Sequence, residues 1–105
     1  MPPAAIQVEL RRSKNPEKKF DAVLTAGSRT KTVAFGQRGA SDFTQHKDEA
    51  RKERYIARHR ANENWSDPAT AGFWSRHLLW EKPSLREAVR KIERKFPKLN
   101  VNLRV

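Results

Sequence analysis

Hydrophobic and polar residues alternate in three short stretches near the start of the chain, at about 6–12, 20–24 and 33–35. A period of two is typical of a strand with one buried face. The segments between these stretches, SKNPE and AGSR, contain residues that favour turns. We therefore predict a three-stranded antiparallel meander over residues 6–36.

The same alternation returns in the segment LNVNLRV, residues 99–105, and predicts a fourth strand. The backbone of this strand needs a partner strand, either in the meander or in a neighbouring chain. Pairing between chains would make the strand the contact of a homo-oligomer. We expect pairing within the domain, because a chain of 105 residues can hardly spare four apolar side chains from its core.

Three helices are predicted between the meander and the last strand, at about 48–63, 68–80 and 84–96. The first has a narrow apolar face, whereas apolar residues lie almost all round the second, as in a helix enclosed by protein. Asp67 and Pro68 form a favourable N-cap and first-turn pair, so we expect the second helix to begin there.

The third helix has the clearest limits. Ser84 and Glu87 form the S-x-x-E pattern of a capping box, and Pro97 stops the helix. Before the first helix, residues 36–47 are expected to form a structured loop, whose Ser, Asp and Thr side chains bond to nearby backbone amides.

These elements predict a single α+β domain over residues 1–105, with a small antiparallel sheet of three or four strands covered by about three helices. The core is expected to form from the large apolar side chains of the last two helices. These residues are Phe73, Trp74, Leu78, Leu79, Leu85, Val89, Ile92 and Phe96. Trp80 is also expected in the core, whereas the polar neighbours of Trp65 fit a core or a surface position equally well.

The composition adds a strong positive charge to this fold. Lys and Arg number 23 against 12 Asp and Glu, which gives a formal net charge of +11. A charge of this size attracts polyanions, and nucleic acid is the leading partner. Duplex DNA is the form that we expect, and acidic surfaces of other proteins are the alternative.

The candidate phosphate-binding residues lie in two regions. Those of the strand region, which is the most basic part, are Arg11, Arg12, Lys18, Lys19, Arg29, Lys31 and Arg38. The others, Arg51, Arg54 and Arg58, fall on one face of the first helix at i, i+3 and i+7, with Tyr55 and His59 turned elsewhere. A simple solvated face is an alternative for this stripe, because exposed charges contribute little to stability.

The segment FGQRG allows two interpretations. Its glycines would let the backbone approach a phosphate closely while Arg38 reaches a base edge or the nucleic-acid backbone. A tight turn that needs glycine for its own geometry explains the segment equally well.

No catalytic site, metal site or cofactor is predicted. The absence of cysteine excludes disulfides and thiolate zinc sites, and the three histidines do not have metal-ligand spacing. No phosphate-binding loop or nucleophile motif is present. No apolar run approaches the roughly 20 residues that cross a bilayer, and the first residues do not resemble a secretion signal. We therefore expect a non-enzymatic protein that is neither secreted nor membrane-spanning.

Three segments of the chain, FGQRGASDFT, HKDEARKERYIARH and WSDPATAGFWSRHLLWEKPSL, resemble a family of small, basic, uncharacterised proteins. Large eukaryotic DNA viruses of the mimivirus and chlorella-virus kind encode this family, and the resemblance covers roughly residues 30–96. It implies a viral setting, in the virion or in the nucleus or cytoplasm of the infected cell. The predicted function is DNA binding, and the alternative is a minor capsid protein that contacts acidic virion proteins.

Overall fold

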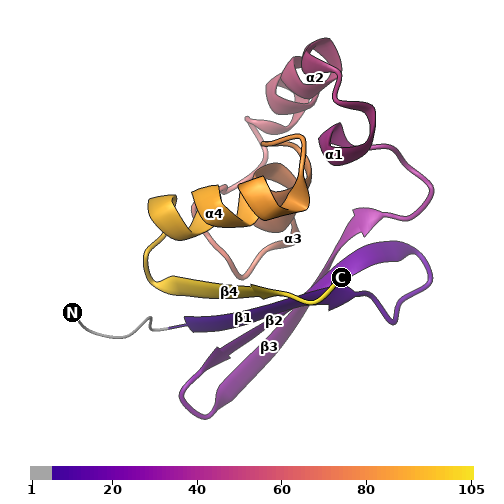
Figure 1. Ribbon diagram of the computed structural model, residues 1–105. Helices are drawn as coiled ribbons and strands as arrows, with labels where there is room; N and C mark the ends of the chain where they lie inside the picture. The colour runs from indigo at the N-terminus through magenta and orange to yellow at the C-terminus, as the bar shows by residue number, and fades with distance from the viewer. Residues whose placement is uncertain (1–5) are drawn as a thin grey trace.

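A four-stranded sheet with helices on one face makes up the fold in the computed structural model, which describes residues 6–105 (Figure 1). The strands lie in the order β3-β2-β1-β4. Their bounds are Ile6–Arg12 for β1, Lys18–Ala26 for β2, Arg29–Gln37 for β3 and Leu99–Leu103 for β4. β1, β2 and β3 pair in antiparallel fashion, which confirms the predicted meander.

β4 pairs with β1 inside the same domain, as expected, but the two strands run parallel. Val8 lies opposite Val101, and the N–H of Arg104 donates to the carbonyl of Leu10 at 2.8 Å. The predicted all-antiparallel sheet is therefore wrong for this strand, and the sheet is mixed. Alternation with a period of two reports which side chains are buried, but it carries no information about the direction of the neighbouring strand.

Five helical segments connect β3 to β4. Their bounds are Phe43–His46 for α1, Glu49–His59 for α2, Ala71–Trp74 for α3, Ser75–Leu79 for the π-helical segment η1 and Leu85–Lys95 for α4. α1 is a single turn inside the predicted loop. Asp42 caps it by accepting from the N–H of Thr44, so the expected contact of loop side chains with backbone amides is present.

α2 ends at His59, earlier than the predicted residue 63. The N–H of Asn62 donates to the carbonyl of His59 at 3.1 Å, which tightens the chain into a turn. The side chain of Asn64 then accepts from the N–H of Ser66 at 3.1 Å. These local bonds compete with further helical bonds, because short polar side chains offer the backbone other partners.

The second predicted helix begins later than expected. Asp67 accepts from the N–H of Ala69 at 2.9 Å and so stabilises a turn, whereas Thr70 is the residue that caps α3. The helix then widens into η1, where the N–H of Trp80 donates to the carbonyl of Ser75 at 3.2 Å. The predicted single helix over 68–80 is thus α3 and η1 joined end to end.

α4 agrees with the prediction. The hydroxyl of Ser84 accepts from the N–H of Glu87 at 3.2 Å, as the first half of a capping box requires. The helix ends at Lys95, two residues before Pro97.

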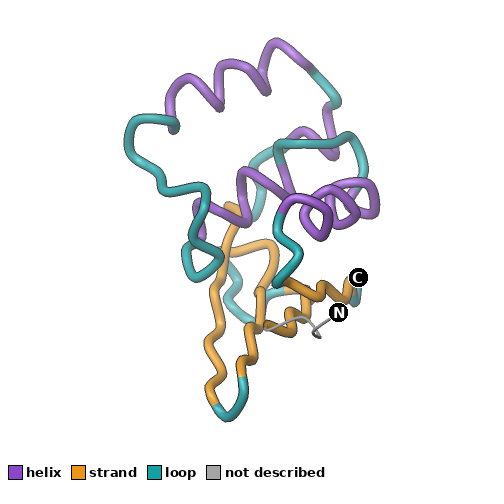
Figure 2. Tube along the Cα trace, turned by 90° about the vertical axis from the view of Figure 1, so that its left-hand side faces the viewer, coloured by secondary structure: helices purple, strands orange, loops and turns teal. Residues whose placement is uncertain are grey.

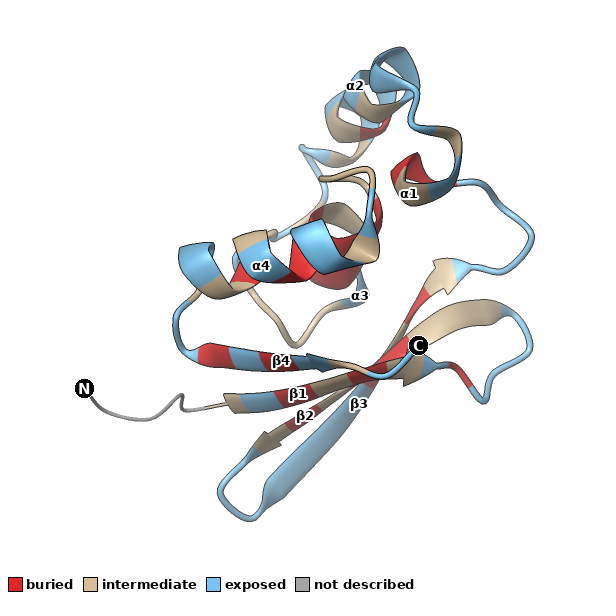
Figure 3. Ribbon diagram, in the orientation of Figure 1, coloured by how far each residue is buried: buried red, intermediate tan, exposed pale blue. Residues whose placement is uncertain are grey.

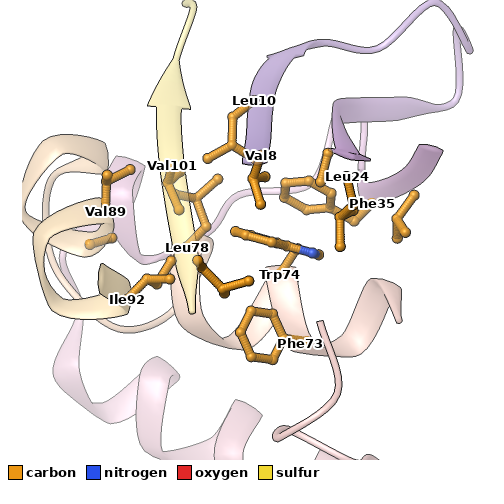
Figure 4. Close-up of a cluster of buried hydrophobic side chains, with 14 of the residues drawn as sticks. Val8, Leu10, Leu24, Phe35, Phe73, Trp74, Leu78, Val89, Ile92 and Val101 are labelled. Carbon is orange, nitrogen blue, oxygen red and sulfur yellow. The ribbon is translucent and has the colours of Figure 1, made fainter. Parts of the chain in front are cut away.

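The core lies between the sheet and the layer formed by α3, η1 and α4 (Figure 4). Trp74 occupies its centre with no exposed surface, and its indole N–H donates to the carbonyl of Pro68 at 2.8 Å. Most of the predicted core is buried, but Leu85 and Phe96 are only partly buried at its margin. Trp80 also lies at the margin, where it is half-buried.

Candidate functional site

A cleft of about 710 Å³ lies between α2 and the end of the sheet where β2 begins and β3 ends. α2 is the outermost of the helices and projects away from the sheet (Figure 1). The cleft is lined from the sheet by Lys18, Lys19, Phe35, Gly36 and Gln37, from α2 by Arg51, Arg54, Tyr55, Arg58 and His59, and from the α3–η1 segment mainly by Gly72, Ser75 and Leu79.

The three arginines of α2 line this cleft together with two aromatic residues of the same helix. The expectation that Tyr55 and His59 turn elsewhere is therefore wrong. They follow Arg51 by four and eight positions, and such residues share one face of a helix as closely as residues three and seven positions apart. The basic face of α2 is thus also its aromatic face.

The guanidinium groups of Arg51, Arg54 and Arg58 are exposed, and within residues 6–105 they form no hydrogen bond or ion pair. Lys18, on the opposite wall, is likewise unpaired through its side chain. Lys19 differs, because its ammonium group binds Asp42 and the side chain of Gln45. The cleft therefore presents four cations that form no ion pair within residues 6–105, while Glu63 is a carboxylate that also lines it.

A pair of stacked aromatic rings holds α2 in place. The ring of Tyr55 lies parallel to that of Trp80, with 4.4 Å between centroids and 3° between planes. Burial, and then the charge of Glu63, raises the pKa of the Tyr55 hydroxyl to about 12. Tyr55 is therefore neutral at physiological pH, and the stack adds no negative charge to the cleft.

A second anchor of α2 is the carboxylate of Glu81, which lies among three cations. Arg76 and Lys91 each approach it to 2.9 Å, and Lys52 of α2 approaches to 3.8 Å. Burial alone would raise the pKa of Glu81, but the hydrogen bond from Lys91 and the charges of Arg76 and Lys52 lower it below its ordinary value. Glu81 thus stays ionised and connects α2, η1 and α4. Sequence reasoning missed this cluster, because its members are far apart in the chain.

Arg38 has a structural task. Its guanidinium donates to the carbonyl of Lys18 at 2.9 and 3.1 Å and to that of Ser13 at 3.3 Å, which ties the β1–β2 connection to the segment after β3. Gly36 and Gly39 adopt positive φ angles of 77° and 92°. A Cβ on Gly36 would also meet the side chain of Leu79 at 2.9 Å. The glycines of FGQRG therefore serve the geometry of the turn and its packing.

A second cleft, of about 530 Å³, adjoins the first. Arg12 and Arg38 line it, together with Phe20, Thr44 and Leu85. The clefts thus bring together most of the candidate phosphate-binding residues, which come from β1, β2, α2 and the segment after β3.

The remaining candidates lie elsewhere. Arg29 and Lys31 are exposed near the tip of the β2–β3 hairpin, which points away from α2 (Figure 1). Arg11 of β1 lies 3.7 Å from Glu9 and lines neither cleft. The structure therefore does not bring these three residues to the candidate site.

The described part of the chain contains no group of three histidine or carboxylate side chains placed to hold a metal ion. Every helix within residues 6–105 is also too short or too polar to span a bilayer.

Comparison with known proteins yields one similarity. No curated protein shows a significant match to the chain, and no solved structure does. The similarity is to a protein family and covers residues 8–59. This stretch runs from β1 to the end of α2 and so includes the arginines of the first cleft. The family description names neither an activity nor a source, so the viral setting stays a prediction. Over residues 8–59 the chain is similar to the proteins described as "Family of unknown function (DUF5754)".

Proposed function

We propose that this protein binds nucleic acid, without catalysis, through phosphate contacts in the cleft beside α2. One observation carries this proposal: Arg51, Arg54 and Arg58 line a single cleft with no described partner for their charge. A guanidinium group binds phosphate with several well-directed hydrogen bonds, and each bound phosphate releases condensed counterions. Lys18 adds a fourth cation on the opposite wall.

The shape of the cleft separates these arginines from other exposed ones. α4 also carries three exposed arginines, Arg86, Arg90 and Arg94, but none of them lines this cleft. The first cleft surrounds a bound phosphate with cations from two walls, whereas the smaller cleft of about 280 Å³ that Arg86 and Arg90 line on α4 contains no other basic residue. Because contacts to phosphate carry no base information, we expect binding that tolerates changes of sequence.

The test compares two triple variants with the same change of charge. In one, Arg51, Arg54 and Arg58 are replaced by Ala, and in the control Arg86, Arg90 and Arg94 are replaced by Ala. Affinity for an oligonucleotide is measured by fluorescence anisotropy across a series of salt concentrations. The α2 variant should bind more weakly, with a log-log salt slope shallower by about 2 to 3, as expected for three lost phosphate contacts.

The control variant should retain most of the affinity and the slope. Equal losses in both variants would show that only net charge matters and would contradict a site in the cleft. Thermal melting of both proteins should be close to that of the unaltered chain, because the replaced side chains are exposed and make no bonds within residues 6–105.

A further inference from the structure

We infer that the nucleic acid is single-stranded and follows one continuous path through both clefts. This inference rests on the proposed function and extends it to the form of the ligand. The two clefts share Lys19, Ala40, Ser41 and Asp42 as lining residues. They therefore meet at the segment that connects β3 to α1.

Cations flank this path at both ends. The first cleft has the unpaired arginines of α2, and the second has Arg12, whose guanidinium makes no bond within residues 6–105. Arg38 commits Nε and Nη2 to carbonyl groups, which leaves its Nη1 for a ligand. Between the clefts, Asp42 neutralises Lys19. A strand whose phosphates contact the two ends would cross this neutral point without repulsion.

The concave shape favours a single strand over a duplex. Proteins read a duplex mainly with a helix, a strand or an arm that projects into its grooves. Here the cations line the walls of clefts in a molecule that measures 39 × 31 × 26 Å. One flexible strand can enter such clefts and place its single row of phosphates along them, as in grooves that bind single-stranded nucleic acid.

Aromatic rings in the first cleft provide a contact for bases. Tyr55 stacks on Trp80 and is buried, and the ring of His59 lies 4.4 Å from that of Tyr55. The side chain of His59 is 40% exposed, so the column of rings ends at the cleft. Glu63 lies 3.6 Å from His59, and its charge would repel a phosphate at this point. This wall therefore suits a base that has left the stack of its own strand and packs against the ring of His59, with the phosphates on the arginine side.

The first experiment compares the two forms of the ligand. Fluorescence anisotropy measures the affinity of the protein for a labelled oligothymidylate of about 12 nucleotides and for a duplex of the same length, a size within the range of known single-strand sites. We expect the single strand to bind at least about tenfold more tightly.

Equal or tighter binding of the duplex would overturn the single-strand inference and leave the proposed function intact. Failure to bind either ligand would overturn both.

The second experiment tests the path by substitution. Arg12→Ala removes a cation of the second cleft, and the control Arg11→Ala removes its neighbour on β1, which lines neither cleft. Arg12→Ala should weaken binding of the oligothymidylate of about 12 nucleotides several-fold. Binding of an oligothymidylate of about 4 nucleotides should stay unchanged, because so short a strand occupies the first cleft alone. If the Arg12→Ala variant binds the longer strand as tightly as the unaltered protein, the strand does not reach the second cleft. That result would overturn the inference of a continuous path.

The third experiment tests stacking at His59. His59→Ala should weaken binding of the single strand about fivefold or more, and His59→Phe should restore it, because a ring without charge still stacks on a base. Equal losses in the two variants would contradict a stacking role for this residue.

Discussion

α2 and α4 are both helices of eleven residues with three exposed arginines, yet the fold uses them in opposite ways. α4 lies over the sheet and buries Ala88, Val89 and Ile92, whereas α2 buries only Tyr55. Figure 3 shows this contrast as buried segments on the side of α4 toward the sheet and a largely exposed surface on α2. A tube view of the chain, turned by 90°, shows α2 as the helical segment farthest from the strands (Figure 2).

The difference teaches how a small domain can keep a basic surface beside a stable core. A helix that supplies the core has one face committed to the sheet, so its charges must point outward. α2 is held at a few points, mainly the stack of Tyr55 on Trp80 and the contact of Lys52 with Glu81, so most of its surface is free. Its basic face can therefore border a cleft rather than cover the sheet.

The largest effect should come from the core that α4 covers. Trp74→Ala removes the central buried ring and should lower the free energy of unfolding by about 3 to 5 kcal/mol, because the cavity cannot collapse fully. Denaturant titration followed by circular dichroism measures this loss. Trp74→Phe should lower the free energy of unfolding by less. An unchanged denaturation midpoint for Trp74→Ala would contradict a central core position for Trp74.

A smaller effect is expected where the two helices are connected. Glu81→Gln removes the charge that Lys52, Arg76 and Lys91 share and leaves these cations close together. The free energy of unfolding should fall by about 1 to 3 kcal/mol. Glu53→Gln, at an exposed position inside α2 whose carboxylate makes no bond within residues 6–105, is the control and should melt like the unaltered protein.

Replacement of Trp80 should affect α2 more than α4. Trp80→Ala removes the ring on which Tyr55 stacks and should reduce global stability by about 1 to 2 kcal/mol, part of which is the aromatic pair itself. Hydrogen exchange should show α2 amides losing protection while those of α4 keep it. Equal loss of protection in both helices would show that α2 unfolds only together with the core.

The smallest effect concerns pH. His77 is buried beside Phe73, its Nε2–H donates to the carbonyl of Trp65 at 2.7 Å, and burial lowers its pKa from the ordinary value of 6.5. The unfolded chain therefore takes up a proton at a higher pH than the folded one. The contribution of neutral His77 to the free energy of unfolding should be fully present above pH 6.5 and should be lost as the pH falls below it.

Denaturant midpoints measured at several pH values check this decline. His77→Gln keeps a side-chain N–H donor but does not titrate, so its midpoint should fall less steeply over the same range. A parallel decline in both proteins would assign the pH dependence to other groups.

Local patterns predicted the parts of the fold that depend on neighbouring residues. The meander follows from alternation, and α4 follows from Ser84, Pro97 and the apolar stripe between them. The start of α3 was misplaced because Asp67 can cap a turn as well as a helix, and only the competition with Thr70 decides between them. The parallel direction of β4 depends on the path of the chain over the sheet, which no local pattern encodes.

The candidate site was predicted only in part. The spacing of Arg51, Arg54 and Arg58 placed them on one face, and a further signal was available: their only acidic neighbour three or four positions away is Asp48, whose carboxylate caps α2. Their position opposite Lys18 depends on how α2 packs against Trp80, so the cleft is a property of the tertiary fold. The roles of Lys19 and Arg38 as structural contacts depend on it as well.

The pairing of β4 with β1 has a consequence for the order of folding during synthesis. Ile6 lies opposite Leu99, so the second neighbour of β1 is made long after β1 has left the ribosome. Until then the meander has an open edge with unpaired backbone groups, and this edge can attract other nascent chains. Closure over such a long stretch of chain slows folding, since its entropy must be lost before the contact forms. We expect a nascent chain that ends before residue 99 to depend on chaperones, and the addition of β4 to release it.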